Sequence, residues 1–95
     1  VLPDVGGGVC RASTVINLAA LDAGLEVLER HSHGLPVGYA PPGKDAAVSW
    51  DSDWDYKFKN NTNAPIQLIA KSQNDILRIE FWQKNNKNIK EVINS

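Results

Sequence analysis

The chain has 95 residues, of which 42% are hydrophobic and 22% are charged, and its formal net charge is −1. These values are ordinary for one globular domain, and without a block of a single charge sign we expect no nucleic-acid partner. No apolar run approaches the roughly 20 residues of a membrane-spanning helix, so we expect membrane attachment only through an anchor elsewhere in a parent protein. The single cysteine, Cys10, excludes an internal disulfide.

The first distinctive stretch is Gly6-Gly7-Gly8-Val9-Cys10, a run of three glycines that leads into the cysteine. Glycines adopt positive φ readily and leave their backbone N–H groups uncovered. A thiol at the start of a helix lies near the positive end of the helix dipole, which favours the thiolate. The stretch is therefore typical of a reactive cysteine, and a tight turn holding an inert cysteine is the structural alternative.

A helix is predicted over residues 13–30, with Ser13 or Thr14 as its N-cap. Leucines recur at helical spacing and predict the face that packs on the core: Leu18, Leu21, Leu25 and Leu28. Gly24 is a mild weakness inside this helix. His31 and His33 come at or just past its C-terminal end, because Gly34 and Pro36 are stop signals.

The C-terminal half reads as β-structure. Residues 46–50 predict a short strand, and residues 54–58 alternate aromatic with charged side chains, as one face of a strand does. Residues 66–71 and 76–82 predict an antiparallel hairpin around a tight turn at 72–75, and we expect 54–58 to pair with it.

These elements predict an α+β fold with one long helix packed on a small antiparallel β-sheet. We expect a single domain over residues 1–83. Residues 84–95 form a polar C-terminal tail, for which disorder and a short edge strand at Val92-Ile93 are both open.

The order of motifs resembles the VanW-like domain family over about residues 5–81. The matching motifs are Gly6-Gly7-Gly8-Val9-Cys10, Ala12-Ser13-Thr14, Ala19-Ala20-Leu21, Ala23-Gly24-Leu25, Glu29-Arg30-His31-Ser32-His33-Gly34-Leu35-Pro36-Val37 and Pro41-Pro42-Gly43-Lys44-Asp45-Ala46. Arg11 stands where the family pattern leads us to expect Gln. The family domain also begins upstream of Val1, so we expect part of it to be missing from this chain.

The resemblance implies a bacterial domain from an anchored or exported protein, outside the cytoplasm in the cell envelope. The family is named after an accessory protein of vancomycin-resistance gene clusters. Peptidoglycan or a cell-wall peptide is therefore the implied partner, and no cofactor is expected. The oligomeric state and the biochemical activity stay open.

One hypothesis is a cysteine-dependent acyl-transfer site, such as that of a peptidase or transpeptidase. Cys10 would be the nucleophile, His33 or His31 the base, and Asp45 the group that orients the imidazole. A helix over 13–30 would be about 27 Å long, however, and it would hold Cys10 far from the histidines unless it broke near Gly24. Asp45 can reach the cysteine, since residues 35–42 are extended.

The spacing therefore favours a non-catalytic module that binds an anionic or carboxylate ligand at the start of the helix. The expected ligand-binding residues are Gly7, Gly8, Cys10, Arg11, Ser13 and Thr14, with His31 in a separate cluster. A metal site from Cys10, the two histidines and an aspartate is a weaker alternative. One cysteine with a His-x-His pair is a poor zinc signal, and we predict no metal.

Overall fold

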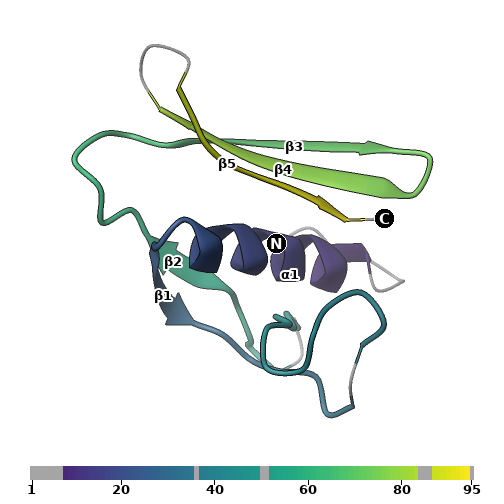
Figure 1. Cartoon of the computed structure of the whole chain (residues 1–95). Coiled ribbons are helices and arrows are strands. Elements are labelled where there is room, and N and C mark those ends of the chain that lie inside the picture. The colour runs from purple at the N-terminus through teal and green to yellow at the C-terminus, as the bar shows by residue number, and fades with distance from the viewer. Residues whose placement is uncertain (1–7, 36, 50–51, 84–86, 95) are drawn as a thin grey trace.

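The computed structural model describes residues 8–35, 37–49, 52–83 and 87–94, and within them it has one helix and five strands. The elements in chain order are α1 (Gly8–Asp22), β1 (Glu26–Glu29), β2 (Lys57–Lys59), β3 (Gln67–Gln73), β4 (Ile76–Gln83) and β5 (Lys87–Asn94). Figure 1 shows α1 lying along the three-stranded sheet β3–β4–β5, with β1, β2 and the long loops on the other side of the helix. The predicted α+β class is confirmed.

The predicted helix boundaries are wrong at both ends, and the helix is shorter than expected. It begins at Gly8 rather than at Ser13 and ends at Asp22 rather than at Arg30. Gly24 has a φ of 74°, its N–H donates to the carbonyl of Leu21 at 3.1 Å, and Leu25 N–H donates to that of Ala20 at 2.9 Å. This pair of hydrogen bonds around a left-handed glycine is the Schellman motif, which ends a helix. Gly24 therefore terminates α1 instead of weakening it.

The early end of α1 also overturns the predicted core face of the leucines. Leu25 is 5% exposed, but Leu21 is 44% and Leu28 58% exposed. Leu28 lies in β1, where side chains alternate with period two, so a helical spacing no longer places it on the core side.

The β3–β4 hairpin is confirmed, with antiparallel pairs from Gln67 opposite Trp82 to Gln73 opposite Ile76. Asn74 and Asp75 connect the strands with φ angles of 53° and 64°. Two successive positive φ angles are typical of the two-residue turns that match strand twist, and Asn and Asp adopt them more easily than most residues. The hairpin is thus specified locally.

The third strand of this sheet is β5, which pairs antiparallel with β4 from Asn94 opposite Leu77 to Lys87 opposite Gln83. It lies within the stretch predicted as a polar tail. Of the two open alternatives for that stretch, the structure has a strand, and it is eight residues long. β4 becomes the central strand of the sheet as a result.

The predicted pairing of residues 54–58 with the hairpin is wrong. The strand there is β2, and it pairs antiparallel with β1, with Val27 opposite Phe58. The strand predicted over 46–50 reduces to an isolated bridge between Ser49 and Trp54, and Trp50 lies outside the described residues. Residues 57–59 therefore belong to a second, two-stranded sheet and are not a third strand beside the hairpin.

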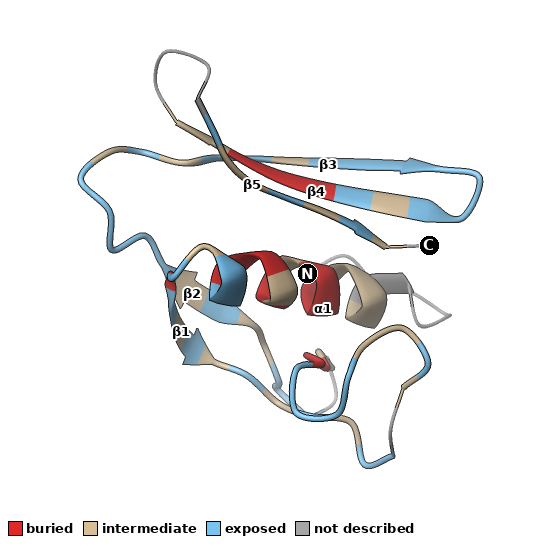
Figure 2. Cartoon of the chain, in the orientation of Figure 1, coloured by how far each residue is buried: buried red, intermediate tan, exposed pale blue. Residues whose placement is uncertain are grey.

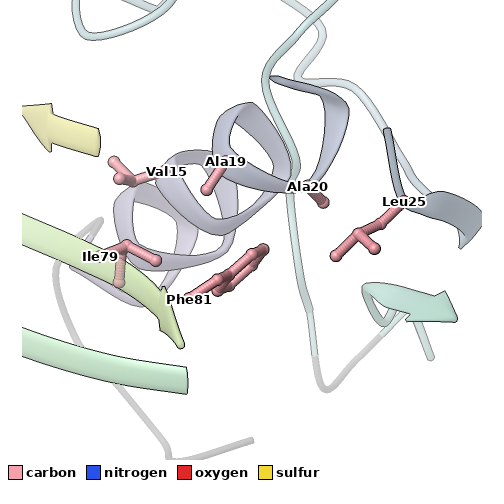
Figure 3. Packing of buried hydrophobic residues seen from close by; sticks show 6 residues of the cluster. All are labelled: Val15, Ala19, Ala20, Leu25, Ile79 and Phe81. Atoms are coloured by element: carbon pink, nitrogen blue, oxygen red, sulfur yellow. The ribbon is translucent and has the colours of Figure 1, made fainter. Parts of the chain in front are cut away.

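The core lies between α1 and the central strand β4. Figure 2 shows the buried residues concentrated on these two elements, and Figure 3 shows six of them packed together: Val15, Ala19, Ala20, Leu25, Ile79 and Phe81. Phe58 of β2 stacks on Phe81, with ring centroids 5.7 Å apart, and so links the small sheet to the core. Among the described residues, no helix is long and apolar enough to cross a membrane.

Candidate functional site

The candidate site is built around residues 44–48, which lie along the N-terminal half of α1. The hydroxyls of Ser13 and Thr14 both donate to the carbonyl of Ala46, at 2.6 and 3.2 Å, and Ala46 N–H donates back to Thr14 at 2.9 Å. One turn later, Asn17 Nδ2 donates to the carbonyl of Lys44 at 2.8 Å. Ser13, Thr14 and Asn17 are all buried, so these polar side chains stabilise the fold by pairing with an irregular backbone.

Cys10 extends this series by one turn in the opposite direction. Its Sγ lies 3.6 Å from the carbonyl oxygen of Val48, to which the thiol donates, and the residue is partly exposed. Because α1 begins at Gly8, Cys10 lies in the first turn, where backbone N–H groups have no partner within the helix. The predicted position of Cys10 near a helix start therefore holds, although the helix starts before it.

The other edge of residues 44–48 faces the histidine segment. Asp45 Oδ2 accepts from the His33 backbone N–H at 2.7 Å and lies 2.6 Å from His33 Nδ1. Arg30 donates to the Asp45 carbonyl at 2.6 Å, and the Ala47 N–H donates to that of His31 at 2.7 Å. The His33 N–H lowers the pKa of Asp45 most, against the effect of burial, and the His33 ring lowers it further. Asp45 is thus ionised and holds the His33 ring.

The expected separation of the histidines from Cys10 by a 13–30 helix is wrong. The chain turns back at Gly24, and β1 carries it to His31 and His33 beside residues 45–47. Cys10 and His33 therefore lie against the same short segment, at Val48 and Asp45 respectively. In this state the thiol bonds to a backbone carbonyl and not to the imidazole.

Tyr39 lies near both side chains. Its ring meets the His33 ring edge to face, with centroids 6.4 Å apart at an interplanar angle of 86°. Burial raises the pKa of Tyr39, and negative charge at the Cys10 sulfur raises it further. The sequence predicts residues 35–42 to be extended, but Gly38 and Tyr39 form a turn, so this prediction is wrong there. The sequence signal that could have pointed to Tyr39 is its aromatic side chain between Gly38 and the Pro41-Pro42 pair.

His31 points into a different cluster, on the side of the two-stranded sheet. Its ring stacks on Trp54 with centroids 4.9 Å apart and an interplanar angle of 1°, and its Nε2 lies 2.9 Å from Glu29 Oε2. The His31 ring lowers the pKa of Glu29 most, followed by the N–H of Asp55, which donates to the same oxygen at 3.0 Å. His31 is thereby held apart from the His33–Asp45 pair.

The other predicted ligand-binding residues make contacts within the chain. Ser13 and Thr14 are the buried hydroxyls described above, and they lie in the second turn rather than at the helix start. The Arg11 guanidinium bonds to Asn94 at the end of β5 and to the carbonyl of Asp75 in the hairpin turn. Gly8 is the first helical residue, and Gly7 lies outside the described residues. Among the residues that the structure describes, no group of three or more His, Cys, Asp or Glu could hold a metal ion.

Comparison with known proteins identifies the family. A family model described as VanW like protein matches residues 1–82. The chain is 40% identical over 91 residues to "Uncharacterized protein YoaR" of Bacillus subtilis (strain 168), an alignment that covers 96% of this chain and 28% of that protein. The chain thus spans less than a third of the length of this relative. No solved structure matches the chain. The chain belongs to the VanW-like protein family.

Proposed function

We propose that this VanW-like domain is a cysteine-dependent acyl-transfer enzyme that acts on cell-wall peptides in the bacterial cell envelope. Cys10 is the nucleophile, His33 the general base and Asp45 the residue that orients the imidazole. The observation that carries the proposal is the His33–Asp45 contact at 2.6 Å, made on the same segment that contacts the thiol. A cysteine, a histidine and a carboxylate are the parts of a nucleophilic site, and the contact between the histidine and the carboxylate is already formed here.

The His33–Asp45 pair supports a base with a fixed orientation. Asp45 Oδ2 holds both the backbone N–H and the ring Nδ1 of His33, so the imidazole cannot rotate freely. With Nδ1 facing the carboxylate, Nε2 is the nitrogen left to accept a proton. The ring is partly exposed, its side chain having 23% of its area accessible, so a substrate can reach it.

The position of Cys10 supports its role as nucleophile. The first turn of α1 supplies backbone N–H groups that can stabilise a negatively charged oxygen next to the sulfur. The thiol proton is directed at the carbonyl of Val48 in this state. Attack therefore requires the thiol to turn from Val48 towards the substrate and His33, and hydrogen bonds in free enzymes commonly tighten in this way when substrate binds.

The reaction proceeds in two balanced steps. His33 takes the proton from the thiol, Cys10 sulfur bonds to the peptide carbonyl carbon, and the amide C–N bond breaks as His33 returns the proton to the leaving amine. An acceptor amine, or water, then attacks the thioester carbonyl and gives its proton to His33. The C–S bond breaks and Cys10 leaves as the thiolate, which regains the proton from His33.

The family supports the proposed substrate class. VanW-like proteins are named after an accessory protein of vancomycin-resistance gene clusters, which supports a role on peptidoglycan stem peptides. The alternative of a binding module also needs the side chains of Arg11, Ser13 and Thr14 as ligands, beside the backbone N–H groups at the start of the helix. Arg11, Ser13 and Thr14 instead bond to the chain itself, so the geometry favours the enzyme.

The test is covalent trapping on the thiol. The chain is incubated with a muropeptide carrying a stem peptide, quenched in acid and measured by intact-mass spectrometry. We expect an adduct whose mass equals the peptide minus its leaving amine, located on Cys10 by digestion and absent from Cys10→Ala. His33→Ala is expected to slow adduct formation on the order of 100-fold, as loss of a general base does.

His31→Ala is the matched control. Both histidines lie on the same segment, but His31 faces Trp54 and Glu29, so its removal should leave the rate of adduct formation close to that of the unchanged chain. Equal rates for the two histidine variants would remove His33 from the mechanism. An unchanged chain that forms no adduct would overturn the acyl-transfer proposal itself.

A further inference from the structure

Arg11 joins three parts of the chain that are distant in sequence. Its Nε donates to Asn94 Oδ1 at 2.9 Å, and its Nη2 donates to the Asn94 carbonyl at 2.8 Å and to the Asp75 carbonyl at 2.8 Å. Figure 1 shows the start of α1, the β3–β4 turn and the end of β5 gathered at one end of the domain. A planar guanidinium suits this task because its fixed N–H groups can bind several oxygens at once.

Asn94 connects Arg11 to the backbone of Tyr39. While its side-chain oxygen accepts from Arg11, its Nδ2 donates to the backbone carbonyl of Tyr39 at 3.0 Å. Tyr39 in turn contacts His33 with its ring. A continuous series of contacts therefore runs from Arg11 through Asn94 and Tyr39 to His33.

We propose that Arg11 and Asn94 are positioning residues of the Cys10 site, which hold Tyr39 in place beside His33. This role rests on the proposed function for its chemistry. Residues 37–44 contain no helix or strand, so the backbone of Tyr39 needs contacts from elsewhere to stay in place. Asn94 supplies such a contact from a regular strand, and sites supported by strands keep their geometry better than sites on loops alone.

Asn94 makes side-chain hydrogen bonds that the stability of the strand alone does not require. Asn94 is the last residue of β5, where a strand end can fray without loss of the core. Both polar ends of its side chain are nevertheless engaged, one by the helix and one by the loop. β5 thereby becomes part of the site, although it contributes no side chain that reacts.

Asn94→Ala tests the role, with Val92→Ala as the matched control. Val92 lies on the same strand and packs against the core, so its truncation weakens β5 without touching Tyr39. Two quantities are measured in the full chain: the pH profile of Cys10 alkylation by iodoacetamide, and the titration of Tyr39 by NMR of ¹³Cζ-labelled tyrosine. For Asn94→Ala we expect the alkylation rate at neutral pH to change on the order of tenfold and the Tyr39 titration to move.

Arg11 is tested by conservative change. Arg11→Gln keeps a hydrogen-bond donor but cannot span Asn94 and Asp75, so it should reproduce part of the Asn94→Ala effect. Arg11→Lys keeps the positive charge but lacks the fork of N–H groups that makes the bidentate contact, so it should also reproduce part of that effect. For the acyl-transfer reaction the expected signature is a lower kcat with little change in KM.

The results separate the two proposals. Superimposable alkylation profiles and Tyr39 titrations for Asn94→Ala and Val92→Ala would show that Asn94 only stabilises the strand, and would overturn the positioning role. Failure of the proposed function is seen elsewhere, as an unchanged chain that forms no thioester with a muropeptide. A moved Tyr39 titration and an altered alkylation rate in Asn94→Ala would support the positioning role in that case too.

Discussion

His33 and Asp45, twelve residues apart in the sequence, meet at two points: the His33 backbone N–H and its ring Nδ1 lie 2.7 and 2.6 Å from the same carboxylate oxygen. The side chain of Asp45 is 8% exposed, so these hydrogen bonds are formed largely away from water. Hydrogen bonds to a buried charged group are stronger than those between neutral groups. The contact therefore fixes the path of the chain after β1 as well as the ring that it orients.

Asp45→Asn should lower the free energy of unfolding at neutral pH by about 1–3 kcal/mol, because an amide replaces the charged acceptor. The fold lowers the pKa of Asp45 from 3.8, so its contribution is complete above that value and is lost as pH falls through the lower folded value. The gap between the variant and the unchanged chain should therefore shrink below about pH 4. Urea unfolding at several pH values measures it.

Asp22→Asn is the control for that series. Asp22 is exposed and pairs with Lys90 at 3.4 Å on the surface, where an ion pair contributes little. It should change stability by well under about 1 kcal/mol at every pH. A loss for Asp45→Asn that does not depend on pH would contradict the electrostatic explanation.

His31→Ala should raise the pKa of Glu29 towards its usual 4.5, because the His31 ring is the largest cause of the lowering. Lys57 is a smaller cause, and its Nζ lies 3.5 Å from Glu29 Oε1, so Lys57→Ala should raise the pKa less. Titration of the Glu29 carboxyl carbon by NMR measures both variants. A larger rise of the Glu29 pKa in Lys57→Ala would contradict the assigned order.

Since a lowered carboxyl pKa stabilises the fold above the unfolded value, both variants should lose stability at neutral pH more than in acid.

Gly24→Ala should destabilise the domain by about 1–2 kcal/mol, since an L-residue pays this penalty in the left-handed region. Gly24 has a φ of 74°, and an added methyl group would meet no atom within 4 Å, so backbone strain is the cause. Gly34 has equally open surroundings without a positive φ, and Gly34→Ala should be neutral or slightly stabilising. Thermal unfolding of the pair tests the difference. If Gly24→Ala lost no more stability than Gly34→Ala, the turn at the end of α1 would tolerate another backbone geometry.

Tyr56→Phe should reduce the loss of stability in alkali. The Tyr56 hydroxyl donates to Oδ1 of the buried Asn17 at 3.0 Å, and burial raises the pKa of Tyr56 to about 12. A raised acid pKa means that the contribution is complete below the unfolded value of 10.0 and is lost as pH rises from there through about 12. Urea unfolding between these pH values compares the variant with the unchanged chain, and parallel curves would contradict the buried hydroxyl as the cause.

The sequence predicted the parts of the fold that neighbouring residues decide. The β3–β4 hairpin follows from alternating side chains and from two turn residues that accept positive φ, so no distant contact is needed to specify it. The residues named from the sequence for a cysteine site, Cys10, His33 and Asp45, lie along one segment, but their catalytic role stays a prediction.

Tertiary structure decided what local patterns left ambiguous. The leucine spacing fits a helix through residue 30, yet Gly24 can either continue a helix at a small cost or end it, and burial of Leu25 together with pairing of β1 to β2 favours the end. That one choice brought His33 to Asp45, on the same segment that the thiol of Cys10 contacts at Val48. Tyr39 and Asn94 joined the site only through contacts across 55 residues of sequence. Sequence spacing predicts a distance in space only where the backbone conformation is known. Here the left-handed conformation of Gly24, together with the burial of Leu25 in the core, determined that conformation.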